Sequence, residues 1–328
     1  MVAPANIRPL VDPVEVDRIN YVNILLMVVS ILAATYLPFE TFLLAYAVLG
    51  PLHYLTEISW LHDRAYFTSG RRDWMLLVGA AVVAAIGSIV PNQITSGLAG
   101  FTLGALFVLA AGMVFARSGI GKLGVLGLGL AVGAIAVWWD PLFILFTAFL
   151  PTLLHVYVFT GLFILHGAVK ARSVSGFLSL VVFIAAPFIC LFIATTPAGY
   201  TPTVYALDAV GPFDSLGWIT LDLLGLPLTQ DTWLGFMRLM GFAYTYHYLN
   251  WFSKTRIINW HTVPRQRLHL IGAVYFSALA LYWYDYHAGF IALMTLSFAH
   301  VMLELPLNYR TLAGLAGETR RLLAAREV

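Results

Sequence analysis

Long apolar stretches dominate this chain and limit the environments in which it can fold. Of its 328 residues, 60% are hydrophobic and only 10% are charged, whereas a soluble domain carries about 25% charged residues. So few charges, gathered between the apolar stretches, cannot cover a soluble globule of this size. The composition disfavours a soluble enzyme, a disordered protein and a nucleic-acid-binding protein, and it predicts an integral membrane protein.

The apolar stretches predict an all-α, polytopic helical bundle. A helix needs roughly 20 mostly apolar residues to cross a bilayer, and lipid-exposed backbone must satisfy its own polar groups. We expect a cytoplasmic segment at 1–18, a transmembrane domain at 19–307 and a cytoplasmic amphipathic tail at 308–328. The ten predicted spans are 19–37, 39–61, 74–91, 98–116, 123–139, 141–167, 175–196, 232–252, 268–285 and 287–307.

The basic residues predict the orientation of these spans. When the segments between spans are assigned alternately to two sides, every Lys and Arg except Arg238 falls on one side. By the positive-inside rule, both termini are then cytoplasmic, and we expect the membrane to be the bacterial inner membrane. The long segment 197–231 carries aspartates and leucines, which predicts an amphipathic piece along the outer interface.

Two local features predict details of the helices. Glycines at 124, 127, 129 and 133 in the fifth predicted span indicate close helix packing. Pro51 and Pro151 lie inside the second and sixth predicted spans, where a proline removes a backbone hydrogen bond and kinks the helix. We therefore expect both spans to be irregular near these prolines.

Ionisable residues inside the predicted spans point to a metal site. Such residues are costly at membrane depth and are usually paired and functional. Residues 53–57 and 300–304 each read His-x-x-x-Glu, which places an imidazole and a carboxylate one turn apart on one helix face. His155 and His247 lie at matching depth, toward the cytoplasmic ends of the sixth and eighth spans. The candidate metal ligands are His53, Glu57, His155, His247, His300 and Glu304, with His62, His166 and His261 at the cytoplasmic mouth.

Each candidate also has a purely structural interpretation. A single buried histidine is often a hydrogen-bonded packing residue, and one His-x-x-x-Glu motif could be a private ion pair. Two such motifs, together with two further buried histidines at similar depth, favour a metal centre.

The donor set indicates oxygen chemistry. Imidazole and carboxylate suit iron or another first-row transition metal, and they also hold zinc. A non-haem iron site of one or two ions, surrounded by lipid, suits a reaction of O₂ with an apolar substrate arriving from the bilayer. We expect Asn250, Lys254 and Tyr54 to take part in catalysis, Thr160 to help fix an imidazole tautomer, and a possible electron donor to act on the cytoplasmic side.

These motifs resemble those of the Brp/Blh family of membrane β-carotene 15,15'-dioxygenases. The resemblance lies in Gly-Pro-Leu-His-Tyr-Leu-Thr-Glu at 50–57 and Ala-His-Val-Met-Leu-Glu at 299–304, with His155 and His247 in the middle positions. This chain differs by inserting Leu52 between Pro and His and by having Glu where the family has Asp. The resemblance implies a polytopic membrane enzyme that uses iron and O₂ to cleave a polyene to an aldehyde.

Other functions remain open at this point. A metal-ion or proton transporter could use the same motifs, although its site is expected near the midplane. A b-type haem protein needs two axial histidines and leaves the two glutamates unexplained. A lipid desaturase or hydroxylase normally has clustered HxxxH and HxxHH motifs, which this sequence lacks.

Overall fold

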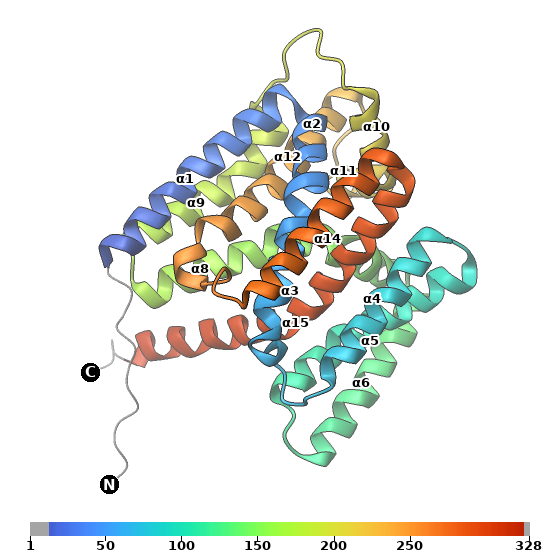
Figure 1. Ribbon diagram of the computed structural model, residues 1–328, viewed down its shortest axis with the longest axis vertical. Helices are drawn as coiled ribbons and strands as arrows, with labels where there is room; N and C mark the ends of the chain where they lie inside the picture. The colour runs from blue at the N-terminus through green and yellow to red at the C-terminus, as the bar shows by residue number, and fades with distance from the viewer. Residues whose placement is uncertain (1–12, 325–328) are drawn as a thin grey trace.

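The computed structural model describes residues 13–324, and the regular structure of this part of the chain is entirely helical (Figure 1). The all-α prediction is therefore confirmed. Six helical segments are long and apolar enough to cross a membrane, whereas the membrane crossing of ten helices and the position of the termini stay predictions. The six segments are Val14–Tyr36, Gln93–Phe115, Gly119–Trp138, Asp140–Ala171, Val174–Ile193 and Tyr286–Arg321.

Each predicted span coincides with a helical stretch, and several stretches are divided by π-helical turns. The main helices are α1 (Pro13–Tyr36), α2 (Pro38–Leu44), α3 (Gly50–His62), α4 (Asp73–Ile89), α5 (Gln93–Phe115), α6 (Gly119–Trp138), α7 (Asp140–Ile144), α8 (Thr160–Ala171), α9 (Val174–Phe188), α12 (Gln230–Ser253), α14 (Arg265–Tyr284) and α15 (Tyr286–Ala324). The π-helical segments are η1 (Ala45–Leu49), η3 (Leu145–Phe159) and η4 (Ile189–Ile193), and the short remaining helices are η2 (Ala65–Phe67), α10 (Val204–Val210), η5 (Gly211–Phe213), α11 (Asp214–Leu223) and α13 (Thr255–Ile258).

Proline explains where the π-helical turns fall. Pro51 follows η1, Pro151 lies inside η3, and Pro187 lies one residue before the end of α9 and is followed by η4. A proline cannot donate the backbone hydrogen bond of its turn, and π-helical turns accommodate such interruptions. The backbone of Thr152, directly after Pro151, leaves the helical region at φ −119° and ψ −105°. The predicted irregularities at Pro51 and Pro151 are therefore confirmed.

Helix α15 joins the last predicted span to the predicted tail. It is one helix of 39 residues that contains Pro306, and the membrane boundary at residue 307 stays a prediction. A proline inside a helix removes one hydrogen bond and bends the helix without ending it here. The final turns run below the ends of α8 and α9 (Figure 1), and Gly314 packs closely on His166 of α8. Residues 1–12 and 325–328, parts of the two predicted terminal segments, lie outside the described residues.

Two hydrophobic clusters fill the described part of the bundle. The first surrounds α12, most of whose residues are buried, and includes Phe42, Phe242 and Tyr246. The second joins α4, α5 and η3 to the later part of α15, through residues such as Leu103 and Val301. Because α15 contributes to both clusters, it connects the α4–α6 group, which stands beside the other helices in Figure 1, to the remainder of the bundle.

The segment predicted to be amphipathic, 197–231, folds back on the bundle. Its helices α10 and α11 bury Ala206, Leu216 and Leu221 and leave Leu223 70% exposed. Trp218 of α11 stacks on Trp233 of α12 with ring centroids 4.8 Å apart. Val204, Tyr205 and Leu224 are exposed as well, so apolar residues lie on both the buried and the exposed side, and a location at the membrane interface stays a prediction.

The glycines of α6 divide into two kinds. Gly129 and Gly133 are buried against α5, and a Cβ added at Gly133 would lie 2.6 Å from the carbonyl oxygen of Phe101. By contrast, a Cβ at Gly124 or Gly127 would meet no atom within 4 Å. The predicted close packing thus involves the pair spaced four residues apart, in agreement with small-residue packing between helices.

We expect Gly133→Leu to destabilise the protein and Gly127→Leu to have little effect. Both changes add the same side chain to the same helix, so the gain in helix propensity is equal. The change at Gly133 forces α5 and α6 apart, which we expect to cost about 1–3 kcal/mol. The measurement is the midpoint of thermal unfolding in detergent; equal midpoints for the two variants would contradict the packing described here.

Candidate metal centre

Four histidines from four separate helical segments converge inside the bundle. His53 of α3, His155 of η3, His247 of α12 and His300 of α15 each place one ring nitrogen within 4.8 Å of the other three. All four are buried, with exposed fractions between 1% and 8%. Histidines from four of the predicted spans therefore meet at one point.

The distances within this four-histidine cluster suit a shared cation. The Nε2 atoms of His53 and His247 are 3.1 Å apart, and those of His155 and His300 are 2.9 Å apart. Imidazole nitrogens bind a transition metal at about 2.0–2.1 Å, so that two ligands of one ion stand roughly 3–4 Å apart. An N–H···N hydrogen bond would explain the short distance within one pair of histidines. A bound cation would explain why the nitrogens of all four histidines converge.

Two buried carboxylates flank the cluster. The Oε2 atom of Glu57 lies 3.0 Å from Nε2 of His53, and Oε2 of Glu304 lies 3.0 Å from Nδ1 of His155. Both distances are those of an ion pair, but the angles at the two contacts are not those of a hydrogen bond. Neither carboxylate oxygen has a hydrogen-bond partner within the described part of the chain. A buried carboxylate without a partner is costly, so these oxygens, together with the imidazole nitrogens, fit a transition-metal ion.

The second His-x-x-x-Glu motif is not an internal pair. The ring of His300 stacks on Tyr54 with centroids 4.2 Å apart and directs Nε2 toward His155. Glu304 therefore meets His155 from another helix instead of the histidine one turn before it. In the first motif, by contrast, His53 and Glu57 contact each other as their spacing indicates.

Thr160 fixes the orientation of His247. Its hydroxyl lies 2.8 Å from the carbonyl oxygen of Val156 and 2.8 Å from Nδ1 of His247. A carbonyl can only accept, so the hydroxyl donates to Val156 and accepts a hydrogen bond from Nδ1–H of His247. The lone pair of His247 is then on Nε2, the atom that faces the other imidazoles, as in a metal-binding histidine with an outer partner.

Aromatic side chains hold the other rings. Trp251 of α12 meets His53 edge-on at 5.5 Å and donates its indole N–H to Thr56. The Tyr54 hydroxyl is hydrogen-bonded to that of Tyr248 at 2.6 Å. A Cβ at Gly50 would lie 3.1 Å from the Tyr54 hydroxyl oxygen, so a larger residue there would press on this tyrosine. Tyr54 thus packs against His300, and its part in catalysis stays a prediction.

Asn250 lies on the turn of α12 that follows His247, and Lys254 comes directly after the end of α12. Asn250 is buried, and its Oδ1 has no hydrogen-bond partner in the described residues. Lys254 follows the last residue of α12, where desolvation lowers its pKa to about 8 although the side chain stays partly exposed. Nearby, Arg267 donates to Asp63 at 2.6 Å and lowers the pKa of that carboxyl, which ties α14 to the end of α3.

Three histidines that we predicted as ligands at the cytoplasmic end of the site do not lie in the four-histidine cluster. His62 is exposed beside Asp63, because nine residues separate it from His53 and place it on another face of α3. His166 lies three turns beyond His155, about 16 Å further along, and packs on Gly314. His261 is exposed in the segment after α13. The cluster is therefore smaller than the predicted set.

Neither a scan against protein-family models nor searches among characterised proteins and solved structures find a match to this chain. The resemblance to the Brp/Blh family therefore stays a prediction based on the motifs.

We expect alanine at any of the four cluster positions to lower the metal content of the purified protein about tenfold or more, because each imidazole is one of few donors in a buried site. The measurement is metal analysis of folded, detergent-purified protein. Alanine at the three mouth histidines provides the control and should leave the metal content unchanged. A loss of metal in a mouth variant, or its retention in two cluster variants, would contradict the assignment. The cluster variants are His53→Ala, His155→Ala, His247→Ala and His300→Ala, and the controls are His62→Ala, His166→Ala and His261→Ala.

We expect Thr160→Val to weaken metal binding about 10–100-fold, since loss of an outer partner of a metal-binding histidine has an effect of this size. Thr160→Ser should retain the affinity because it keeps the hydroxyl. Thr245→Val makes the same change on α12, where the hydroxyl has no hydrogen-bond partner among the described residues, and should have no effect. Competition with a chelator measures the affinity; equal losses in the two valine variants would argue against the role of Thr160.

Proposed function

We propose that this protein is a membrane non-haem iron oxygenase that acts with O₂ on an apolar, lipid-soluble substrate. The observation that supports this most directly is the buried convergence of four imidazoles and two carboxylates. In the same proposal, ten helices cross the bacterial inner membrane and both termini are cytoplasmic, as the distribution of basic residues predicts.

The proposal assigns roles to the residues of this chain. The four histidines would hold the metal, with Glu57 and Glu304 as further ligands or as acceptors that orient the imidazoles. When bound, iron would supply the O₂ chemistry, and the surrounding apolar side chains would exclude water from it. Thr160 keeps the Nε2 lone pair of His247 directed inward, and Asn250, one turn further along α12, has a buried amide oxygen without a hydrogen-bond partner among the described residues.

The resemblance to the Brp/Blh family suggests one form of this activity. It implies oxidative cleavage of a carotenoid-like polyene to an aldehyde, whereas a desaturation or hydroxylation of a lipid would use the same metal. We propose the broader class, a membrane iron oxygenase with a lipid-soluble substrate, because the donor set supports the metal more directly than the substrate.

The crowding of the cluster argues against a b-type haem. The ring centroids of His53 and His247 are 4.8 Å apart, and those of His155 and His300 are 4.7 Å apart. A haem needs two axial ligands on opposite sides of a wide, flat macrocycle. Four imidazoles packed edge to face leave no space for such a plane between them.

Metal content, an optical spectrum and O₂ uptake on one purified sample test the proposal. We expect about one or two equivalents of iron, no Soret band and iron-dependent O₂ uptake in the presence of lipid extract. Less than about a tenth of an equivalent of any transition metal in folded protein would overturn the proposal. A Soret band would indicate haem, and uptake of zinc or iron into liposomes without O₂ consumption would indicate a transporter.

A further inference from the structure

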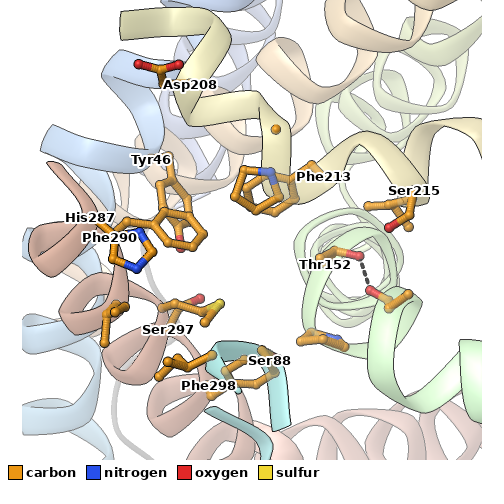
Figure 2. Close-up of a pocket in the computed structure, with 18 of the residues that line it drawn as sticks. Tyr46, Ser88, Thr152, Asp208, Phe213, Ser215, His287, Phe290, Ser297 and Phe298 are labelled. Carbon is orange, nitrogen blue, oxygen red and sulfur yellow. Dashed lines mark hydrogen bonds between the residues drawn. The ribbon is translucent and has the colours of Figure 1, made fainter. Parts of the chain in front are cut away.

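A cavity of about 740 Å³ is lined on one side by residues of α10 and α11, among them Asp208 and Ser215 (Figure 2). Three of the four segments that carry the histidines also line the cavity, each through a residue three positions before its histidine. These residues are Thr152, Tyr244 and Ser297, which precede His155, His247 and His300. Three residues of helix correspond to about 4.5 Å, so the inner end of the cavity is about one turn from the candidate metal ligands.

The cavity walls are apolar with scattered hydroxyls. Phe213, Phe290 and Phe298 provide aromatic surface, and Ser88 and Ser297 contribute hydroxyl groups. The volume is within the range of roughly 300–1,000 Å³ that is typical of small-molecule sites, which are also mostly apolar with a few polar groups. The cavity thus has the size and lining of a site for a lipid-soluble molecule.

The charged and titratable lining residues stand apart from the cluster. Asp208 of α10 and His287 at the start of α15 are exposed lining residues, and Asp208 lies at the opposite end of the view from Ser297 and Phe298 (Figure 2). An exposed carboxylate accepts a hydrogen bond from a hydroxyl group and repels an anionic head group. The lining therefore favours a neutral, hydrogen-bonding head over a carboxylate.

On the other side of the cluster, two tryptophans fill the space toward the basic loops. Trp251 packs on His53, and Trp60 packs on Trp251 with ring centroids 5.7 Å apart. The sequence predicts a site that opens toward these basic loops, and this stays a prediction. The cavity lies on the opposite side, where residues of the acidic segment 197–231 line it.

We propose that this cavity binds an elongated, lipid-soluble alcohol, admitted at the end of the bundle that carries α10 and α11. The hydroxyl head lies at Asp208 and His287, and the apolar chain extends toward the four histidines. The inference rests on the proposed function, because it supplies the substrate site and substrate class of the same centre.

Binding of radiolabelled oleyl alcohol to the full-length, detergent-purified protein tests the proposal, with oleate as the matched anionic probe. We expect saturable binding of the alcohol and at least tenfold weaker binding of oleate. Ile291→Trp and Ala148→Trp fill the cavity from two different helical segments and should each weaken binding of the alcohol at least tenfold. Ala292→Trp, the neighbouring exposed position on α15, is the control and should bind within twofold of the unmodified protein.

A separate variant tests whether the hydroxyl head of the ligand lies at Asp208. Asp208→Asn removes the negative charge and keeps the shape, so the preference for the alcohol over oleate should fall to less than threefold. An unchanged preference would overturn the position of the head. Metal content is measured in every variant and should equal that of the unmodified protein, which also shows that the variant is folded.

The results separate this inference from the proposed function. No saturable binding of oleyl alcohol, or equal binding by Ile291→Trp and Ala292→Trp, would overturn the cavity proposal even if the protein holds iron and consumes O₂. Conversely, cavity-dependent binding in a protein without metal would support the cavity as a lipid site and overturn the oxygenase.

Discussion

The burial of four imidazoles and two carboxylates in an apolar bundle is the constraint on which this structure depends. Groups of this kind are costly away from water unless they are paired or coordinate a cation. The protein supplies part of the compensation itself, through Thr160 at His247 and Tyr54 against His300. The remaining oxygens of Glu57 and Glu304 have no hydrogen-bond partner among the described residues. A cation is the partner that would satisfy nitrogens and oxygens together.

The irregular helices are a consequence of this convergence. His155 lies in η3, four residues after Pro151, and His53 lies in α3, two residues after Pro51 and four after the end of η1. A regular helix would present its residues at fixed angular steps, whereas a π-helical turn changes the direction in which the following side chains point. Such turns are frequent at functional sites, and here two of the four histidine-bearing segments contain or follow one. The prolines thus act on the direction of the histidines through the backbone.

The sequence predicted the parts of this arrangement that depend on spacing along one helix. Stretches of apolar residues predict where the helices lie. The similar depth of His53, His155, His247 and His300 in their spans predicts that these four histidines are metal ligands. The rotation of one helix against another cannot be obtained from spacing alone. For this reason spacing places Glu304 beside the histidine of its own helix, and it keeps His166 among the candidate ligands although His166 lies three turns from His155. Packing of Gly314 on His166 depends on the bend of α15, which no single-span pattern indicates.

The position of the cavity bears on the choice between an enzyme and a carrier. A carrier presents its site alternately to both sides of the membrane, which requires two paths to the same residues. Here the cavity approaches the cluster to within about one helical turn from the α10–α11 end, and Trp60 and Trp251 occupy the side toward the basic loops. The ring of Trp251 is further fixed by its hydrogen bond to Thr56. In the proposed oxygenase, one roomy side and one packed side let a membrane-dissolved substrate reach the site and leave it by the same path, whereas a carrier would in addition have to move Trp60 and Trp251 aside to open the second path.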